Sequence, residues 1–427
     1  MKNILFSLII IIITSHIFTT SKKNDYDLLL EWGKNNSIYI SDKIAMNYTN
    51  ENNKNYYVKK KINKDEIIIS IPKKLLLNIE SVLNLLGPKT KKQYENYKKE
   101  HFNNNSNNNK KDPNDILSYR IDQSFLAYLM TIANKNKSNK NKFYQFYKYF
   151  FNTFETDLER FPVLYNTEQI RLLIFSLFGN ELVQTKEMYD EEFEILQSKI
   201  HKKPLDQDEY YKYRIFTFNK LVNISGVSSI IPFVDMLETN PINFNLQINY
   251  TYENDSISVM AVKNIKKDDK LKMAVVQMTN SGSLITYGKV YEENKNYIEN
   301  FRIPKISVNF LKIKNLDPMM AANGDIVDIS LQNYYEEIIP IYMDLSKLLK
   351  EDGSKVSALR LFQENLLSIR DQYDKVTVSE LFKHFYTPKY VNNIRSVLST
   401  EKLYLNKKIR EMKQIINKYA KESEQDL

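Results

Sequence analysis

The residue types that most often perform catalysis or hold metals are scarce in this chain. It has no cysteine, which excludes disulfides, thiolate zinc sites and cysteine nucleophiles. Its four histidines are scattered along the sequence, at His16, His101, His201 and His384. Because histidine metal sites need several ligands at short and regular spacings, we predict no metal site and metal-free chemistry.

One polar turn stands out as a candidate site. The stretch IIPFVDMLETNP, residues 230–241, predicts an apolar strand that ends in a tight turn carrying Glu238 and Thr239. These two residues place a carboxylate beside a hydroxyl. Asp235, just upstream, is interpreted as a structural carboxylate that accepts backbone N–H bonds at the turn.

Length and composition limit the classes of protein that the chain can belong to. It has 427 residues, of which 42% are hydrophobic and 12% aromatic, so we expect two or three structural units with buried cores. The formal net charge is +9, but the lysines are interleaved with Asn, Tyr and Ile throughout. A dispersed charge of this kind is weak support for nucleic-acid binding, and we predict no specific nucleic-acid partner.

The N-terminus has the pattern of a targeting segment. Lys2 precedes an almost continuously apolar run from Ile4 to Ile13, and small residues around Ser21 offer a cleavage position. We predict a signal peptide over residues 1–21, and a secretory-pathway location: secreted, lumenal, or in a plastid-type organelle reached through that pathway. The run is shorter than the roughly 20 residues of a membrane span, and we expect no span after signal removal.

Hydrophobic patterning divides the rest of the chain into alternating regions. Strand patterns with a short first helix occupy 22–100, an Asn/Lys-rich low-complexity loop 101–112, and helical patterns 113–223. Strand-and-turn patterns return over 224–303, including SGSLITYGKV, and 304–427 is mostly helical. This order predicts an α+β fold, in which a β-rich unit is split by a helical insert and followed by a helical domain.

Four stretches in this order carry a resemblance to a known family. They are YDLLLEWGKNNSIYIS with KKKINKDEIIISIPKKLLL, the helical insert, IIPFVDMLETNP leading into SVMAVKNIKKDDKLKM, and TNSGSLITYGKV. Together they resemble the SET-domain protein methyltransferases of the Rubisco large-subunit methyltransferase and actin-histidine methyltransferase type. The resemblance covers nearly all of the chain after the signal segment. It implies a knotted, β-rich SET domain interrupted by a helical insert and followed by an α-helical substrate-binding domain.

The resemblance also implies a reaction and the residues that it needs. Such enzymes transfer a methyl group from S-adenosylmethionine to a protein side chain, and this in-line displacement needs near-attack geometry. In the family, glycines let the backbone approach the cofactor closely. An Asn-His pair positions the cofactor, and a tyrosine hydroxyl with backbone carbonyls surrounds the transferred methyl group.

This chain departs from the family pattern at the cofactor-binding positions. The Gly-x-Gly motif aligns with Asn53 and Asn55, so side chains stand where bare backbone is expected. The Asn-His pair aligns with Glu238 and Thr239, and an upstream arginine aligns with Leu221. These five positions are the family-equivalent cofactor contacts, and we expect them to be non-functional.

The catalytic tyrosine is also missing from its expected place. Its position falls at Val275, and no tyrosine lies within one residue of it. Tyr287 is a possible substitute, although an aromatic residue in such a segment is more often part of the core. We therefore interpret the chain as a degenerate SET-fold protein, without a cofactor, that binds a protein or peptide. The alternative is an active S-adenosylmethionine-dependent protein-lysine or histidine methyltransferase with a remodelled pocket.

Overall fold

A computed structural model describes most of the chain. The described residues are 25–48, 54–105, 114–135, 144, 158–201, 203–224, 227–251, 255–276, 278–291, 294, 301–321 and 326–425, so the predicted signal peptide over 1–21 lies outside them. The chain forms two compact units, each of which is described by itself. The first comprises 1–156, 220–238 and 245–271, and the second comprises 157–219, 239–244 and 272–427.

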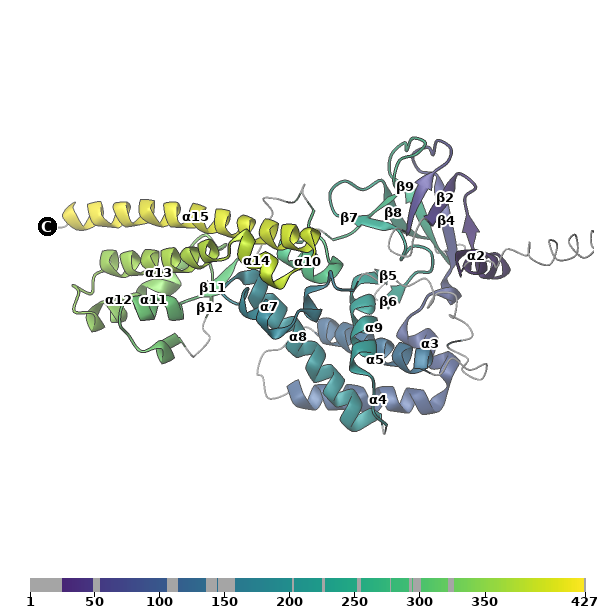
Figure 1. Ribbon diagram of the computed structural model, residues 1–427, viewed down its shortest axis with the longest axis horizontal. Helices are drawn as coiled ribbons and strands as arrows, with labels where there is room; N and C mark the ends of the chain where they lie inside the picture. The colour runs from purple at the N-terminus through teal and green to yellow at the C-terminus, as the bar shows by residue number, and fades with distance from the viewer. Residues whose placement is uncertain are drawn as a thin grey trace, which may run out of the picture. The chain divides into compact units, whose positions relative to one another are not determined.

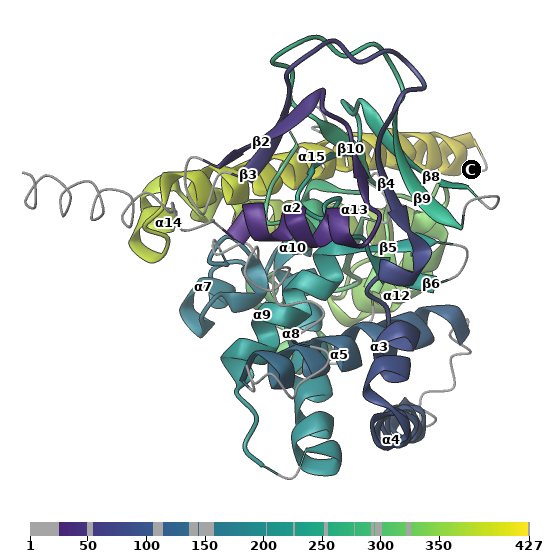
Figure 2. The ribbon, with the colours of Figure 1, turned by 90° about the vertical axis from the view of Figure 1, so that its right-hand side faces the viewer.

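An antiparallel sheet forms the framework of the first unit (Figure 2). Four of its strands lie in the order β1 (Tyr39–Ile40), β4 (Ile67–Pro72), β9 (Ser256–Ala261) and β8 (Leu246–Thr251). Strand β4 pairs on both of its edges, and its Ile68, Ile69 and Ile71 are fully buried. A run of β-branched residues is typical of such a central strand, and the strand predicted from the sequence is confirmed here.

Two hairpins complete the strands of this unit. Strand β2 (Ile44–Tyr48) pairs with β3 (Lys54–Val58), and β5 (Leu221–Ile224) pairs with β6 (Val227–Ile230). Leu77 exchanges backbone hydrogen bonds of 3.0 and 2.8 Å with Ile230. This bridge ties the second hairpin to the segment that follows β4.

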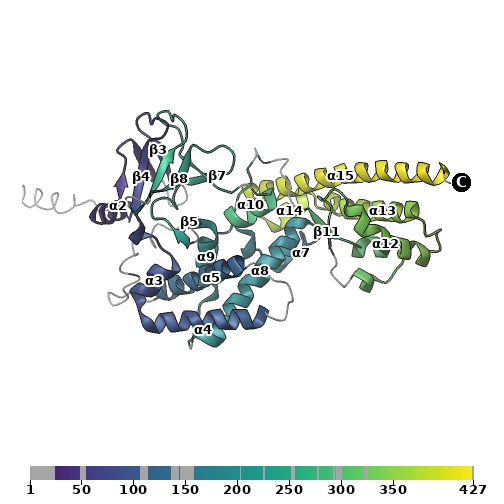
Figure 3. The ribbon, with the colours of Figure 1, turned by 180° about the vertical axis from the view of Figure 1, so that it is seen from behind.

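The helices of the first unit are α2 (Asp25–Asn35), α3 (Ile79–Leu86), α4 (Pro88–Asn105) and α5 (Asn114–Lys135), and α3, α4 and α5 pack together (Figure 3). Helix α2 confirms the short helix expected at the start of the chain. The loop predicted over 101–112 is wrong over 101–105, because α4 continues through these residues. His101 is fully buried and packs edge-on against Tyr97 with ring centroids 4.5 Å apart, which anchors the last turns of α4.

The second unit begins with η2 (Pro162–Leu164), α7 (Thr167–Arg171), α8 (Leu177–Ile195), η3 (Leu196–Ile200) and α9 (Gln207–Lys220). The predicted insert over 113–223 therefore contributes helices to both units, since α5 belongs to the first. Helices α8 and α9 are joined by a fully buried ion pair. Arg214 Nε donates to Glu192 Oε2 at 2.7 Å, and the guanidinium lies 4.5 Å from the ring centroid of Tyr189.

The segment after β7 (Glu238–Asn240) and β10 (Lys272–Ala274) corrects one prediction. We expected SGSLITYGKV to belong to a strand-and-turn region, but its first residues form helix α10 (Asn280–Tyr287). Thr279 caps this helix by accepting a hydrogen bond from Gly282 N, and Gly288 ends it in the left-handed conformation, at φ 64°. Both capping signals are present in the sequence, but the helix is too short to show a clear period.

The rest of the second unit is mostly helical, as predicted for 304–427. A small hairpin of β11 (Arg302–Pro304) and β12 (Ile326–Asp328) flanks α11 (Val308–Ile313) and η5 (Pro318–Ala321). Helices α12 (Tyr334–Leu348), α13 (Lys355–Lys375), α14 (Val378–His384) and α15 (Pro388–Gln425) follow, and α12 and α15 both pack against α13 (Figure 1). Buried residues spaced three or four apart on α13, such as Leu359, Phe362 and Leu366, form part of one core.

Within the described ranges, none of the helices has the length and apolarity that crossing a bilayer requires. The same ranges contain no cluster of three or more histidine, aspartate or glutamate side chains that could hold a metal ion.

Candidate functional site

Three of the predicted cofactor positions lie on separate strands. Asn55 is in β3 opposite Asn47, Leu221 begins β5 opposite Ile230, and Glu238 begins β7 with a half-buried side chain. Asn53 lies outside the described residues. The role of these positions stays a prediction.

In the second unit, Thr239 is the centre of a small polar cluster. Its hydroxyl lies 3.0 Å from the hydroxyl of Tyr291, so these two groups share a hydrogen bond. Its carbonyl accepts a hydrogen bond of 2.9 Å from Lys289 Nζ, and this ammonium also lies 4.9 Å from the ring centroid of Tyr291. The hydroxyl and the carbonyl of Thr239 are thus both occupied by the chain's own side chains.

Tyr287 joins the same cluster through Tyr291. It is buried, and the two tyrosine rings pack edge-on with centroids 6.4 Å apart. The structure therefore brings the predicted residues Thr239 and Tyr287 close to one another. Val275 is half-buried just after β10 and supplies no hydroxyl. Our sequence reasoning missed Tyr291 and Lys289, although both lie within four residues of Tyr287.

A cavity of about 950 Å³ opens within the second unit. One face of α8 forms a wall, with Leu177, Asn180, Glu181 and Gln184 at helical spacing. The other walls come from the segment before α8, from β11, α11 and β12, and from α13. A helix of the predicted insert and elements of the C-terminal helical region thus line one cavity.

The start of α8 is fixed in three ways, which sets the position of this wall. Ser176 caps the helix by accepting a hydrogen bond of 3.0 Å from Gly179 N. Glu401, on α15, accepts from Phe178 N at 2.9 Å. Gly179 has no room for a side chain, because a Cβ there would lie 1.9 Å from the carbonyl oxygen of Leu173.

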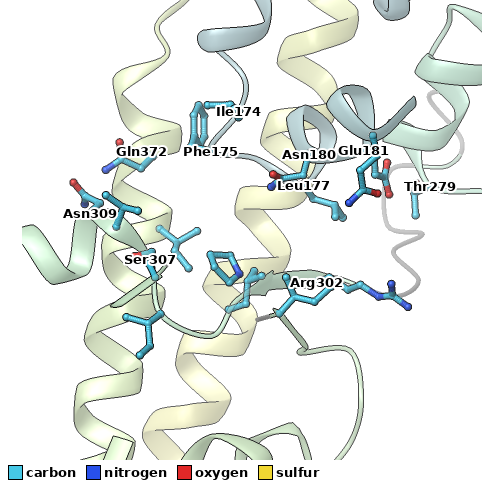
Figure 4. Close-up of a pocket in the computed structure, with 18 of the residues that line it drawn as sticks. Ile174, Phe175, Leu177, Asn180, Glu181, Thr279, Arg302, Ser307, Asn309 and Gln372 are labelled. Atoms are coloured by element: carbon cyan, nitrogen blue, oxygen red, sulfur yellow. The ribbon is translucent and has the colours of Figure 1, made fainter. Parts of the chain in front are cut away.

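Polar side chains line two sides of the cavity, and apolar ones lie between them (Figure 4). Asn180, Glu181 and Arg302 lie on one side, and Gln372 and Asn309 lie on the other. Ile174, Phe175 and Leu177 are the apolar residues labelled in this view. An elongated ligand with an apolar middle and polar ends matches this arrangement.

Glu181 is the acidic group of the cavity. Burial raises the pKa of its carboxyl, whereas a hydrogen bond from Ser281 and the positive charge of Arg302 act in the opposite direction. Its Oε2 atom is shielded from solvent and has no hydrogen-bond partner among the described residues. Burying a carboxylate oxygen without a hydrogen-bond partner costs free energy, so a ligand donor that reaches this oxygen forms a strongly stabilising hydrogen bond.

A second carboxyl lies behind the cavity wall. Glu401 is 4% exposed and accepts hydrogen bonds from Phe178 N and from the hydroxyl of Tyr373, each at 2.9 Å. Burial raises its pKa to about 8, and the negative charge of Glu181 adds to this effect. Asn280, also buried, lines a much smaller cavity beside Glu401.

Several solved structures share this arrangement of elements. Rubisco LSMT bound to AdoMet aligns with a TM-score of 0.61 at 12% identity, over 92% of both chains. The SET domain of LSMT bound to lysine and AdoHcy gives 0.60 at 12% identity, over 92% of both chains. Rubisco LSMT bound to sinefungin and monomethyllysine gives 0.58 at 13% identity, again over 92% of both.

The chain has the SET-domain fold. The α+β class and the SET-type architecture predicted from the sequence are therefore confirmed. No protein-family model matches the sequence, and no curated protein matches it. At 12–13% identity the fold is shared while most side chains differ. The function of this SET-type chain has to be argued from its own residues.

Proposed function

We propose that this protein is a SET-fold binding module that has lost methyl transfer and holds a protein or peptide segment in the cavity of its second unit. The cavity is the main observation that supports this proposal. At about 950 Å³ it is large enough for several side chains. Large apolar side chains are exposed at its rim: Ile174 is 52% exposed, Val308 46% and Ile326 50%. A group of exposed apolar residues is typical of an interaction surface.

The surroundings of Thr239 support the loss of methyl transfer. In the family that the sequence resembles, this turn contacts the cofactor. In this chain the carbonyl of Thr239 accepts a hydrogen bond from Lys289, and the hydroxyl of Thr239 shares one with Tyr291. The sulfonium of S-adenosylmethionine is a cation, and the ammonium of Lys289 would repel a second cation placed beside the same carbonyl. These residues do not fit the cofactor, and no transfer step is assigned to them.

The second candidate is an active S-adenosylmethionine-dependent methyltransferase acting on protein lysine or histidine. One observation favours it. Tyr287 is buried beside Tyr291, which contacts Thr239, so a phenol is present close to the turn even though Val275 has replaced the expected one. If Tyr287 were the substitute, the Tyr287→Phe variant would lose activity and keep its stability.

A single array experiment separates the two candidates. The full chain is incubated with immobilised peptides and S-adenosylmethionine labelled in its methyl group, and retained protein and incorporated label are both measured. The binding proposal predicts retention on a subset of peptides with no label above that of a boiled control. Label that depends on active protein would establish the methyltransferase and overturn the proposal. Absence of both signals would count against each candidate.

A further inference from the structure

We propose that the cavity of the second unit recognises its peptide through a lysine or arginine side chain, whose charged group pairs with Glu181. The inference rests on the proposed binding function and specifies what is bound. It rests on two buried polar atoms, at opposite sides of the cavity, that have no hydrogen-bond partner among the described residues. The apolar surface between them and the exposed rim support it.

Glu181 supplies the acceptor at one side. Its Oε2 atom has no hydrogen-bond partner in the described part of the chain, while the residue as a whole is half-buried and lines the cavity. The terminal torsion of a glutamate is broad, so a small rotation turns this oxygen toward the cavity. Hydrogen bonds to charged groups contribute more than neutral ones, and a cationic donor is therefore the best partner for it.

Gln372 supplies a donor at the other side. Its Nε2 atom is buried without a hydrogen-bond partner among the described residues, whereas its Oε1 atom lies 3.5 Å from Lys375 Nζ. The neighbouring Asn309 is held in place by a bond of 2.7 Å to Ser368 Oγ. A peptide carbonyl is the acceptor that matches such a donor. The cavity thus offers a place for the backbone of a ligand and another for its charged tip.

The apolar middle fits the stem of a long basic side chain. Phe175, Leu177 and Ile369 line the cavity. Phe175 and Leu177 lie between its polar sides (Figure 4). Lysine and arginine carry a run of methylene groups that packs on apolar surface while the charged head reaches a polar partner. A short polar side chain would leave this surface uncovered.

The rim indicates that the ligand is part of a larger polypeptide. Besides Ile174, Val308 and Ile326, the nearby Met319 is 71% exposed and Met320 is 41% exposed. Exposed methionines form adaptable contact surfaces for protein partners. A free amino acid would fill the cavity without covering them.

An anionic ligand is the opposite possibility, because Arg302 and Lys312 also line the cavity. Both side chains are exposed at the rim, where water already solvates their charge. Exposed ion pairs contribute little to binding, whereas a buried oxygen without a hydrogen-bond partner gains considerably more from a donor. The balance favours a cation at Glu181.

The test compares peptides that differ only in charge. Nonapeptides with a central lysine or arginine are measured against the full chain by fluorescence polarisation, beside matched peptides with norleucine or citrulline. These neutral analogues keep the shape and remove the charge. We expect binding to fall at least tenfold with the neutral analogues. The Glu181→Gln variant should lose the preference for basic peptides, and the Arg302→Gln variant should keep it.

Glu187→Gln is the matched control, since Glu187 is exposed on the same helix and does not line the cavity. The inference is overturned if basic and neutral peptides bind equally, or if acidic peptides are preferred and Arg302→Gln abolishes their binding. Those outcomes leave the binding function intact. If no peptide of any charge binds, the proposed function itself fails and the inference with it. The analogue comparison decides the question even if Glu181→Gln does not fold.

Discussion

Replacing Glu401 by glutamine should change how the stability of the second unit depends on pH. Burial raises the pKa of this carboxyl from 4.5 to about 8. Since one pKa unit corresponds to about 1.4 kcal/mol, ionising Glu401 in the folded unit costs roughly 5 kcal/mol. The folded unit therefore holds a proton that the unfolded chain has released. The stability that this bound proton contributes is fully present below about pH 4.5, and it is lost as the pH rises through 8.

Glutamine removes the titration and keeps an acceptor oxygen. At pH 5.5, Glu401→Gln should equal the parent protein or fall slightly below it, because Phe178 N and Tyr373 both donate to the carboxyl. At pH 9 the variant should be more stable by about 2–4 kcal/mol, which is less than the full ionisation cost because an amide accepts more weakly than a carboxylate.

Urea unfolding followed by far-UV circular dichroism measures this difference, since the second unit is largely helical. The only tryptophan, Trp32, belongs to the first unit and provides a separate probe of it. Glu422→Gln, exposed on the same helix as Glu401, serves as the control. A stability difference between Glu401→Gln and the parent that is the same at pH 5.5 and pH 9 would refute the reasoning.

Three further predictions follow from contacts within the second unit. Arg214→Leu leaves the buried carboxylate of Glu192 without its cationic partner and should cost about 3–5 kcal/mol in urea unfolding, whereas Glu192→Leu combined with Arg214→Leu should recover much of this loss. Gly179→Ala places a Cβ 1.9 Å from a backbone oxygen and should lower the free energy of unfolding by about 3 kcal/mol or more. Gly282→Ala is the control: Gly282 holds the same position of its own capped helix, the nearest contact of a Cβ there is at 3.3 Å, and the melting temperature should change little. Binding of basic peptides should weaken as the pH falls, beginning at a higher pH than for an ordinary glutamate because burial raises the pKa of Glu181; a pH-independent affinity would contradict this.

Much of the architecture follows from short-range patterns in the sequence. The run of isoleucines in β4 is typical of a buried strand, and the apolar residues of α13 recur at helical spacing; the structure confirms both elements. Helix α10 was missed because eight residues give little periodicity, although Thr279 and Gly288 have the residue types of a cap at each end. The prediction of a loop at residue 101 is wrong because the burial of His101 outweighs the polar composition around it, and helix α4 continues through this residue.

The cavity could not be read from the sequence in the same way. Glu181 and Gln372 are nearly two hundred residues apart, and neither belongs to a motif. Their roles come from tertiary packing, which leaves one atom of each without a hydrogen-bond partner in the part of the chain that the structure describes. Thr239 and Tyr287 were found because they align with family motifs. The contact that occupies Thr239 comes from Lys289, a residue type that occurs everywhere in this chain.

Cofactor binding by the full chain is the most direct test of the central claim that the site no longer seats a methyl donor. The melting temperature is measured with S-adenosylmethionine and with its demethylated product at about 1 mM, where a ligand at a hundred times its dissociation constant adds about 2.7 kcal/mol of stability. Because Thr239 is occupied by Lys289 and Tyr291, the account predicts no shift with either compound. A saturable rise in melting temperature with either one would contradict it.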